Sequence, residues 1–212
     1  MKQFDTIVIE LENQVKLFGL WSESVDTGYY NWEDDYPNWN DVSGLFIKIL
    51  NEVPLSNWTN DLLNNMLYVL SRDHESEVLA MELVKSPQHL ILLGQYGKSY
   101  TDYKARWQLC YYLSEVYQLE PMAEDIILHY VQNDPEEYVR RRALLSLGYI
   151  KSKYAEENAL KAWSTNLEYQ KIAALEVLHQ INSIYLEQYL KKALNDESDY
   201  VRQNAERIIL EQ

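Results

Sequence analysis

Residues 134–148 read DPEEYVRRRALLSLG. Asp134 is a typical N-cap residue, and Pro135 suits the first helical position, where its missing N–H costs nothing. Apolar residues then recur at helical spacing, so the stretch predicts a helix over about 135–150 with one buried face. The residues expected on that face are Val139, Ala143, Leu147 and Ile150.

This stretch has three related copies elsewhere in the chain. Each copy has a turn-type Asp or Asn, then a basic residue, a small or apolar residue three positions later, and a Leu or Ile four positions after that. Successive basic residues are 34, 31 and 31 positions apart. Such a period is typical of stacked units that cannot bury their apolar faces alone. The copies are Asp102…Arg106-x-x-Leu109-x3-Leu113, Asp134…Arg140-x-x-Ala143-x3-Leu147, Asn166…Lys171-x-x-Ala174-x3-Leu178 and Asp196…Arg202-x-x-Ala205-x3-Ile209.

Other helical patterns pair with these copies across short turns. We therefore predict an all-α, right-handed α-solenoid of about six antiparallel hairpins, forming a single domain over 1–212. Repeats are regular over 100–212 and degenerate over 1–99, where 19–40 forms a long loop. We expect Asn166 and Asp196 to cap their helices as Asp134 does. The other predicted helices are 4–18, 41–53, 57–71, 75–85, 87–96, 102–117, 121–133, 153–163 and 184–194.

The chain is strongly acidic. Its 212 residues carry a formal net charge of −14, from 33 acidic and 19 basic side chains. This balance disfavours nucleic acids and anionic membranes and favours a protein partner with a basic surface. The single Cys110 fits a reducing compartment. The start of the chain lacks a secretory signal, and no run of eighteen apolar residues occurs, so we expect a cytoplasmic protein without a membrane span.

The stretch from Asp134-Pro135 to Leu147-Gly148 resembles a HEAT-like repeat, most closely the short variant described in phycobilisome lyases. The copy at Asp196 lacks the Pro and the Gly, and the copy at 166 has Gln170-Lys171 where the family prefers Val-Arg. The resemblance covers residues 100–212 well, whereas residues 1–99 share only the regular succession of helical hairpins. It implies the fold but not an activity, because scaffolds, lyases, hydroxylases and DNA glycosylases share this architecture.

The basic residues of the four copies would stand in a row on successive second helices. One hypothesis is a cationic stripe for an anionic ligand, strengthened by the run 140–142. The alternative is that each residue pairs with an Asp or Asn of a neighbouring turn, such as Asp134 or Asp196, a tie between repeats that the resemblance implies. Arg141 and Arg142 do not recur as a set, so one of them could bind a ligand. The ladder consists of Arg106, Arg140, Lys171 and Arg202, with Arg141 beside it.

The long connector is acidic and aromatic. Residues 21–41 contain six acidic and six Trp or Tyr residues and no Lys or Arg. Long loops in compact arrays are functional or disordered, and this aromatic content argues against disorder. Aromatic residues anchor interfaces, while acidic ones attract a basic partner. The predicted partner-binding residues are Trp32, Glu33, Asp34, Asp35, Tyr36 and Trp39.

The alternative for the connector is a cap over the first hairpin. Trp21, Tyr29 and Trp39 would then fold back while Glu33, Asp34 and Asp35 stay in water. Cap and interface are compatible, and the sequence leaves both open.

Candidate chemistry is sparse. The four histidines form no helical pair of ligands and Cys110 has no Cys partner, so we predict no metal and no cofactor. Deoxyhypusine hydroxylases place several His-Glu dipeptides around two irons, whereas this chain has only His74-Glu75. Glycosylases need a cationic groove, yet residues 101–212 carry net −5 from 13 basic and 18 acidic residues. We predict no catalytic residue.

The sequence thus predicts a non-enzymatic protein-interaction module or scaffold that uses the concave face and the connector. Tyrosines near the start of each second helix are expected to pack between repeats and in part to line that face. One alternative is an immunity-like inhibitor of a basic toxin. Another is a HEAT-like enzyme of the DNA glycosylase or lyase type that uses the arginine stripe. The tyrosines are Tyr103, Tyr138, Tyr169 and Tyr200.

Overall fold

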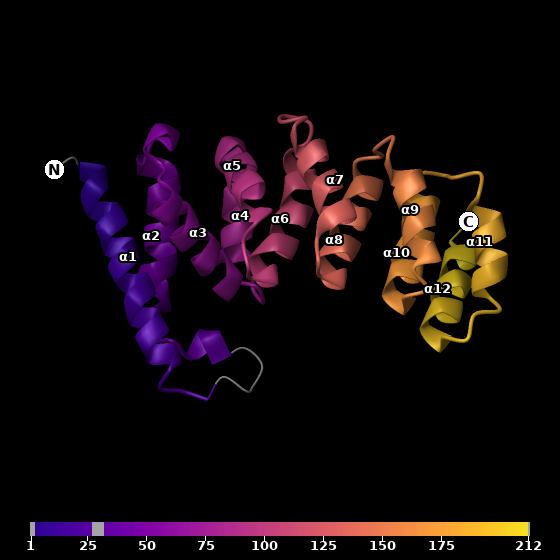
Figure 1. Cartoon of the computed structure of the whole chain (residues 1–212), viewed down its shortest axis with the longest axis horizontal. Helices are drawn as coiled ribbons and strands as arrows, with labels where there is room; N and C mark the ends of the chain where they lie inside the picture. The colour runs from indigo at the N-terminus through magenta and orange to yellow at the C-terminus, as the bar shows by residue number, and fades with distance from the viewer. Residues whose placement is uncertain (1–2, 27–31, 212) are drawn as a thin grey trace. The chain divides into compact units, whose positions relative to one another are not determined.

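The computed structural model describes residues 3–26 and 32–211, and every regular element in them is a helix (Figure 1). This confirms the predicted all-α class and is consistent with an α-solenoid. The chain divides into two compact units, Met1–Tyr112 and Leu113–Gln212, and each is described by itself. The single domain and the number of hairpins stay predictions.

The first unit is built from helices that pack in sequence order. Helix α1 contacts α2 and α3, α2 contacts α4, and α5 contacts both α3 and α4. The last helix, α6, begins in this unit and ends in the second. The elements are α1 (Gln3–Ser22), η1 (Trp32–Asp35), α2 (Trp39–Glu52), η2 (Leu55–Asn57), α3 (Asn60–Arg72), α4 (Val78–Val84), α5 (Pro87–Gly97) and α6 (Tyr103–Val116).

The second unit consists of three helical hairpins, α7–α8, α9–α10 and α11–α12, in the part of the chain that the structure describes. The second helices pack side by side, with α10 between α8 and α12. Ala143, Ala174 and Ala205 are fully buried on these helices, which lets neighbouring backbones approach closely. The elements are α7 (Ala123–Asn133), α8 (Glu137–Tyr149), α9 (Ala155–Ser164), α10 (Glu168–Gln180), α11 (Leu186–Ala193) and α12 (Asp199–Leu210).

The predicted start of α8 is wrong by two residues. The helix begins at Glu137, and Pro135 lies in the preceding turn. The Asp134 carboxylate accepts the Glu136 N–H at 2.9 Å. Short polar side chains favour such turns because they bond to backbone two residues on. Asp134 therefore orders the approach to the helix rather than its first turn.

The predicted caps of the next two copies are also wrong. Asn166 has a φ of 60°, and Leu167 precedes α10 instead. Asp196 accepts the Ser198 N–H at 3.0 Å. Ser198 is the N-cap of α12, because its hydroxyl accepts the Val201 N–H at 3.3 Å. In both places the turn is longer than the motif alone indicates.

The turns after α8 and α10 have the same backbone geometry. Lys151 and Asn182 have φ values of 51° and 53°. In each turn the next residue's N–H returns to the helix, from Ser152 to Leu147 and from Ser183 to Leu178, both at 2.9 Å. Asn tolerates a left-handed backbone better than Lys. The repeat therefore fixes the turn even where the side chain does not favour it.

None of the described helices has the length and apolar character that crossing a bilayer requires.

Candidate interaction surface

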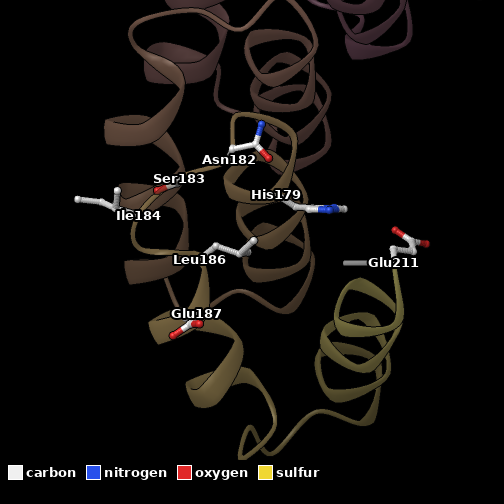
Figure 2. A pocket seen from close by; sticks show the side chains of 7 residues that line it. All are labelled: His179, Asn182, Ser183, Ile184, Leu186, Glu187 and Glu211. Carbon is white, nitrogen blue, oxygen red and sulfur yellow. The ribbon is translucent and has the colours of Figure 1, made fainter.

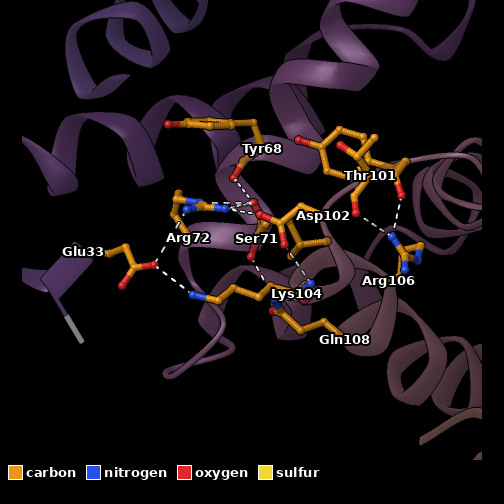
Figure 3. Close-up of polar contacts among 11 residues, drawn as sticks. Glu33, Tyr68, Ser71, Arg72, Thr101, Asp102, Lys104, Arg106 and Gln108 are labelled. Carbon is orange, nitrogen blue, oxygen red and sulfur yellow. Dashed lines mark hydrogen bonds and ion pairs between the residues drawn. The ribbon is translucent and has the colours of Figure 1, made fainter. Parts of the chain in front are cut away.

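Glu33 of the connector belongs to a partly buried ion network of the first unit (Figure 3). The Glu33 carboxylate is 3% exposed, and its Oε1 lies 3.2 Å from Lys104 Nζ and 3.8 Å from Arg72 Nη1. The prediction that Glu33 stays in water is therefore wrong, whereas its contact with a partner stays a prediction. A carboxylate this buried requires nearby cations, and α3 and α6 supply them.

Arg72 joins this network to the turn before α6. Its Nη2 forms an ion pair with Asp102, and its guanidinium lies 5.2 Å from the centre of the Tyr68 ring. Asp102 also accepts the Lys104 N–H at 2.9 Å. One guanidinium thus neutralises two carboxylates from different elements, η1 and the α6 turn.

Burial shifts the pKa values of groups around the network. Burial raises the pKa of Tyr100 to about 12, with Asp102 adding to the rise and Arg72 opposing it. Burial also raises the pKa of Tyr68. For His74, burial and then Lys104 lower the pKa, although Glu33 and Glu75 oppose this. Burial thus favours the neutral form of the His74 imidazole.

Acidification is expected to destabilise the first unit through His74. Because its folded pKa lies below the unfolded value of about 6.5, the unfolded chain binds more protons and stability falls as pH drops below about 6.5. His89, whose pKa burial also lowers, adds to the effect. Urea unfolding at about pH 7.5 and 5.5 measures it. In His74→Asn combined with His89→Asn the fall should shrink, and an unchanged fall would assign the pH dependence to other groups.

The aromatic part of the connector packs on the end of α1. Tyr36 is 5% exposed, with its ring centre 4.9 Å from that of Phe18 and 5.0 Å from that of Trp21. Trp39 also contacts Phe18, at 6.1 Å between ring centres. Tyr36 is therefore a core residue that exposes little of its ring, and its contact with a partner stays a prediction. This geometry supports the cap interpretation for Trp21 and Trp39.

Two other predicted partner-binding residues of the connector reach the surface. Asp35 is exposed and Trp39 partly exposed, so both remain candidates for contact with a partner. The side chains of Trp32 and Asp34, and the whole of Tyr29, lie outside the described residues.

Three arginines of the basic ladder bind their own turns. Arg106 Nη1 donates to the carbonyls of Tyr100 and Thr101 at 2.6 and 2.9 Å. Arg140 and Arg202 donate to the carbonyls five and six positions before them in the same way, at 2.5 to 3.0 Å. Turn carbonyls that no helix satisfies need such donors. These three arginines thus have a structural role, but they fill it through backbone carbonyls of their own turns, where the expected partner was an Asp or Asn of a neighbouring turn.

Lys171 takes a different partner. Its Nζ lies 2.7 Å from Asp196 Oδ2 in the next turn, with side-chain exposures of 12% and 11%. Burial by itself would raise the pKa of Asp196, but the hydrogen bonds from Lys171 and from the Ser198 N–H lower it overall. This pair ties α10 to the α11–α12 turn, as the tie between repeats requires.

Arg141 follows Arg140 of the ladder in sequence, but within the described residues it donates to no turn carbonyl. Its guanidinium carbon is 4.7 Å from the centre of the Tyr138 ring and 4.6 Å from that of Tyr169. The side chain is partly exposed, and Tyr169 is 49% exposed. Helices α8 and α10 thus hold one guanidinium between two rings, one from each helix. Cation–π contacts of this kind contribute about 0.5–1 kcal/mol each at exposed sites.

A small hollow adjoins this stack. Its volume is about 260 Å³. Tyr200 of α12, which is 59% exposed, stands 31 positions after Tyr169 and continues the row of tyrosines. We call Tyr138, Arg141, Tyr169, Tyr200 and the hollow the stacked-tyrosine surface. The hollow is lined by Tyr138, Arg141, Arg142, Leu145, Ile172, Ala173 and Glu176.

Two other hollows in the second unit are more polar. One, of about 490 Å³, lies by the α10–α11 turn, and His179, Glu187 and Glu211 are among the residues that line it (Figure 2). Another, of about 440 Å³, surrounds the Lys171–Asp196 pair. No group of three or more potential metal ligands occurs within residues 3–26 and 32–211. Neither hollow brings together an evident set of catalytic groups.

Sequence comparison identifies the repeats of the second unit. Residues 124–209 match the family model for HEAT repeats. The match covers less than half of the chain, and together with the all-helical structure it fits a HEAT-like repeat protein, as the sequence motif predicts. Among curated proteins, none matches the chain at a significant level. HEAT repeats generally act as scaffolds for protein interactions.

Proposed function

We propose that the chain is a non-enzymatic protein-interaction module whose partner binds the stacked-tyrosine surface. The observation that carries this proposal is the stack of Arg141 between Tyr138 and Tyr169, next to a hollow of about 260 Å³. Interfaces are enriched in Tyr and Arg, and their strongest contacts fill pockets. The HEAT-repeat match supports protein binding as the general role.

The physical basis of binding would be rigid aromatic area. Tyr169 and Tyr200 are 49% and 59% exposed, yet both start helices that are packed on one side. A tyrosine has few rotatable bonds, so little entropy is lost when a partner covers it. A partner lying across α8, α10 and α12 would meet one such ring per repeat.

The partner's overall charge can be proposed from the chain's own charge. A net charge of −14 attracts a protein with a basic surface and increases its association rate. Asp35 and Trp39 of the connector are a second place where such a partner could touch. A cytoplasmic location and the narrower role of an immunity-like inhibitor remain parts of this proposal. The enzyme alternative is weakened, because Arg106, Arg140 and Arg202 are occupied by turn carbonyls.

Removing the two stacked rings should abolish partner capture. Tyr138→Ser with Tyr169→Ser is expected to lower affinity about 30-fold or more, because two central aromatic contacts are lost. The measurement compares the proteins retained from native lysate by immobilised wild-type and variant chains, followed by titration of the shared species. The control is Tyr149→Ser at the end of α8, where Tyr149 is 57% exposed.

Equal capture by the wild-type chain and the double variant would contradict this surface. If Tyr149→Ser lowered capture as much as the double variant does, the exposed tyrosines would be binding proteins non-specifically. If replacing Asp35 and Trp39 removed the captured protein while the double variant kept it, the connector would be the binding site.

A further inference from the structure

We propose that Arg141 recognises a carboxylate on a protein segment whose neighbouring aliphatic side chain fills the hollow between α8 and α10. This inference rests on the proposed function and names the chemistry of the partner at its surface. It assigns to Arg141 a binding role that the residues of the basic ladder do not have.

Two rings hold the guanidinium of Arg141 in place, and its N–H groups stay available to a ligand. The central carbon of the guanidinium lies over the Tyr138 and Tyr169 rings, 4.7 and 4.6 Å from their centres, and in the described part of the chain these rings are its only interactions. Ring contacts leave the N–H groups at the edge of the guanidinium able to donate. Arginine presents five such donors in a rigid fork that matches a carboxylate with two parallel hydrogen bonds. The stack fixes this fork before the ligand arrives.

The neighbouring arginines Arg140 and Arg207, by contrast, bind groups of the chain itself. Arg140 spends Nη1 on the carbonyls of Asp134 and Pro135 at 2.7 and 2.8 Å. Arg207 binds Glu176 at 2.6 Å and Glu211 at 2.9 Å. These cations have internal partners, whereas Arg141 faces solvent at the edge of a hollow.

The hollow determines what accompanies the carboxylate. Leu145, Ile172 and Ala173 line it between the two helices. An aliphatic side chain there would be removed from water on a surface that is already apolar, which is favourable by about 25 cal/mol per Å². An acidic residue next to Leu, Ile or Val, or a C-terminal aliphatic residue with its free carboxylate, satisfies both features.

A polyanion fits less well than a single carboxylate. Glu176 stands at the rim of the hollow, and residues 101–212 carry net −5 from 13 basic and 18 acidic residues. A nucleic acid needs several neutralised phosphates, but Arg106, Arg140 and Arg202 bind turn carbonyls. One carboxylate in an otherwise neutral or basic segment meets one guanidinium and avoids repulsion elsewhere.

The test uses peptide arrays probed with the full chain. Three sets of random octapeptides are compared: internal Asp or Glu with an amidated C-terminus, no acid with a free C-terminal carboxylate, and no carboxylate at all. We expect binders in the first or second set with Leu, Ile or Val beside the carboxylate. The set that binds tells a side-chain carboxylate from a terminal one.

The best binders are then titrated by fluorescence polarisation. Arg141→Met should weaken binding about 10- to 100-fold, the loss of a bidentate charge-assisted hydrogen bond. Arg141→Lys should retain only part of the affinity, because an ammonium cannot form the fork. Lys161→Met, which removes one exposed positive charge on α9, should leave affinity unchanged. Thermal unfolding of Arg141→Met checks that the fold is intact.

Several results would overturn the inference. Peptides without a carboxylate that bind wild type and Arg141→Met equally would remove Arg141 from recognition. If the double variant Tyr138→Ser, Tyr169→Ser no longer bound those peptides, the proposed function of the surface would stand. The recognition of a carboxylate by Arg141 would then be wrong. Failure of wild type to select any carboxylate-bearing peptide, from either the first or the second set, also refutes it, as does tighter binding of a single-stranded oligonucleotide at physiological salt.

Discussion

Arg72→Met is expected to lower the free energy of unfolding of the first unit by about 2–4 kcal/mol, because the partly buried Asp102 loses its ion-pair partner and the buried Glu33 is left with Lys104 alone. Glu33 is 3% exposed, so water cannot replace the guanidinium there. Methionine keeps the apolar stem, and the loss therefore reports the charge. Urea unfolding followed by circular dichroism measures the change, and hydrogen exchange assigns it to the first unit.

The matched control is an exposed ion pair in the same unit. Lys16→Met removes the pair with Glu12, whose side chains are 65% and 47% exposed. Exposed pairs of this type contribute about 0.5 kcal/mol or less. If Arg72→Met cost no more than Lys16→Met, the network would not anchor the connector, and its end would be free to move toward a partner.

Gly148→Leu should destabilise the second unit by about 2–3 kcal/mol through overpacking between α8 and α10. A Cβ at Gly148 would lie 2.4 Å from Gln180 Oε1 and 2.9 Å from Val177 Cγ2. The amide can move aside, but the valine is stiff because it is branched at Cβ. The three further carbons of leucine enlarge the clash. Thermal and urea unfolding measure the loss.

A second glycine gives the opposite expectation. Gly44 lies inside α2, and a Cβ there would meet nothing within 4 Å. Gly44→Ala is expected to stabilise the first unit by about 0.5–1 kcal/mol, because alanine is the better helix former. A stabilised Gly148→Leu would mean that α8 and α10 are not as close as the structure indicates.

The helices could be predicted because their signals are local. Periodic apolar residues located nearly every helix to within a few residues, and Ala143, Ala174 and Ala205 are buried as the motif indicates. The caps were harder, since a turn-type Asp can bond two residues ahead instead of capping. The choice between Asp196 and Ser198 depends on a turn length that the spacing of residues does not encode.

The connector shows where sequence reasoning fails. A run of acidic residues without Lys or Arg indicates a solvated surface. The cations that compensate the charge of the buried Glu33 are Arg72 and Lys104, which lie 39 and 71 positions later in the chain. No local pattern reveals such a pairing. The burial of Tyr36 against Phe18 is equally non-local.

The candidate surface was partly visible in the sequence. The regular recurrence of Tyr138, Tyr169 and Tyr200 at 31-residue spacing indicated a row, and the run 140–142 broke the repeat pattern. The sequence indicated that either Arg141 or Arg142 could bind a ligand, but it did not distinguish between the two. The choice depends on side-chain directions around α8, which place Arg141 against Tyr169 of the next repeat.

The shared geometry of the turns at Lys151 and Asn182 has an evolutionary consequence. Both turns leave the preceding helix at the same backbone angle and return the same N–H to it, 31 residues apart. Junctions that are alike at both ends let a gene segment be copied in frame, since the new hairpin meets a neighbour of the shape it already fits. The chain can lengthen by whole modules, and each added module can bring its own exposed ring for selection to modify.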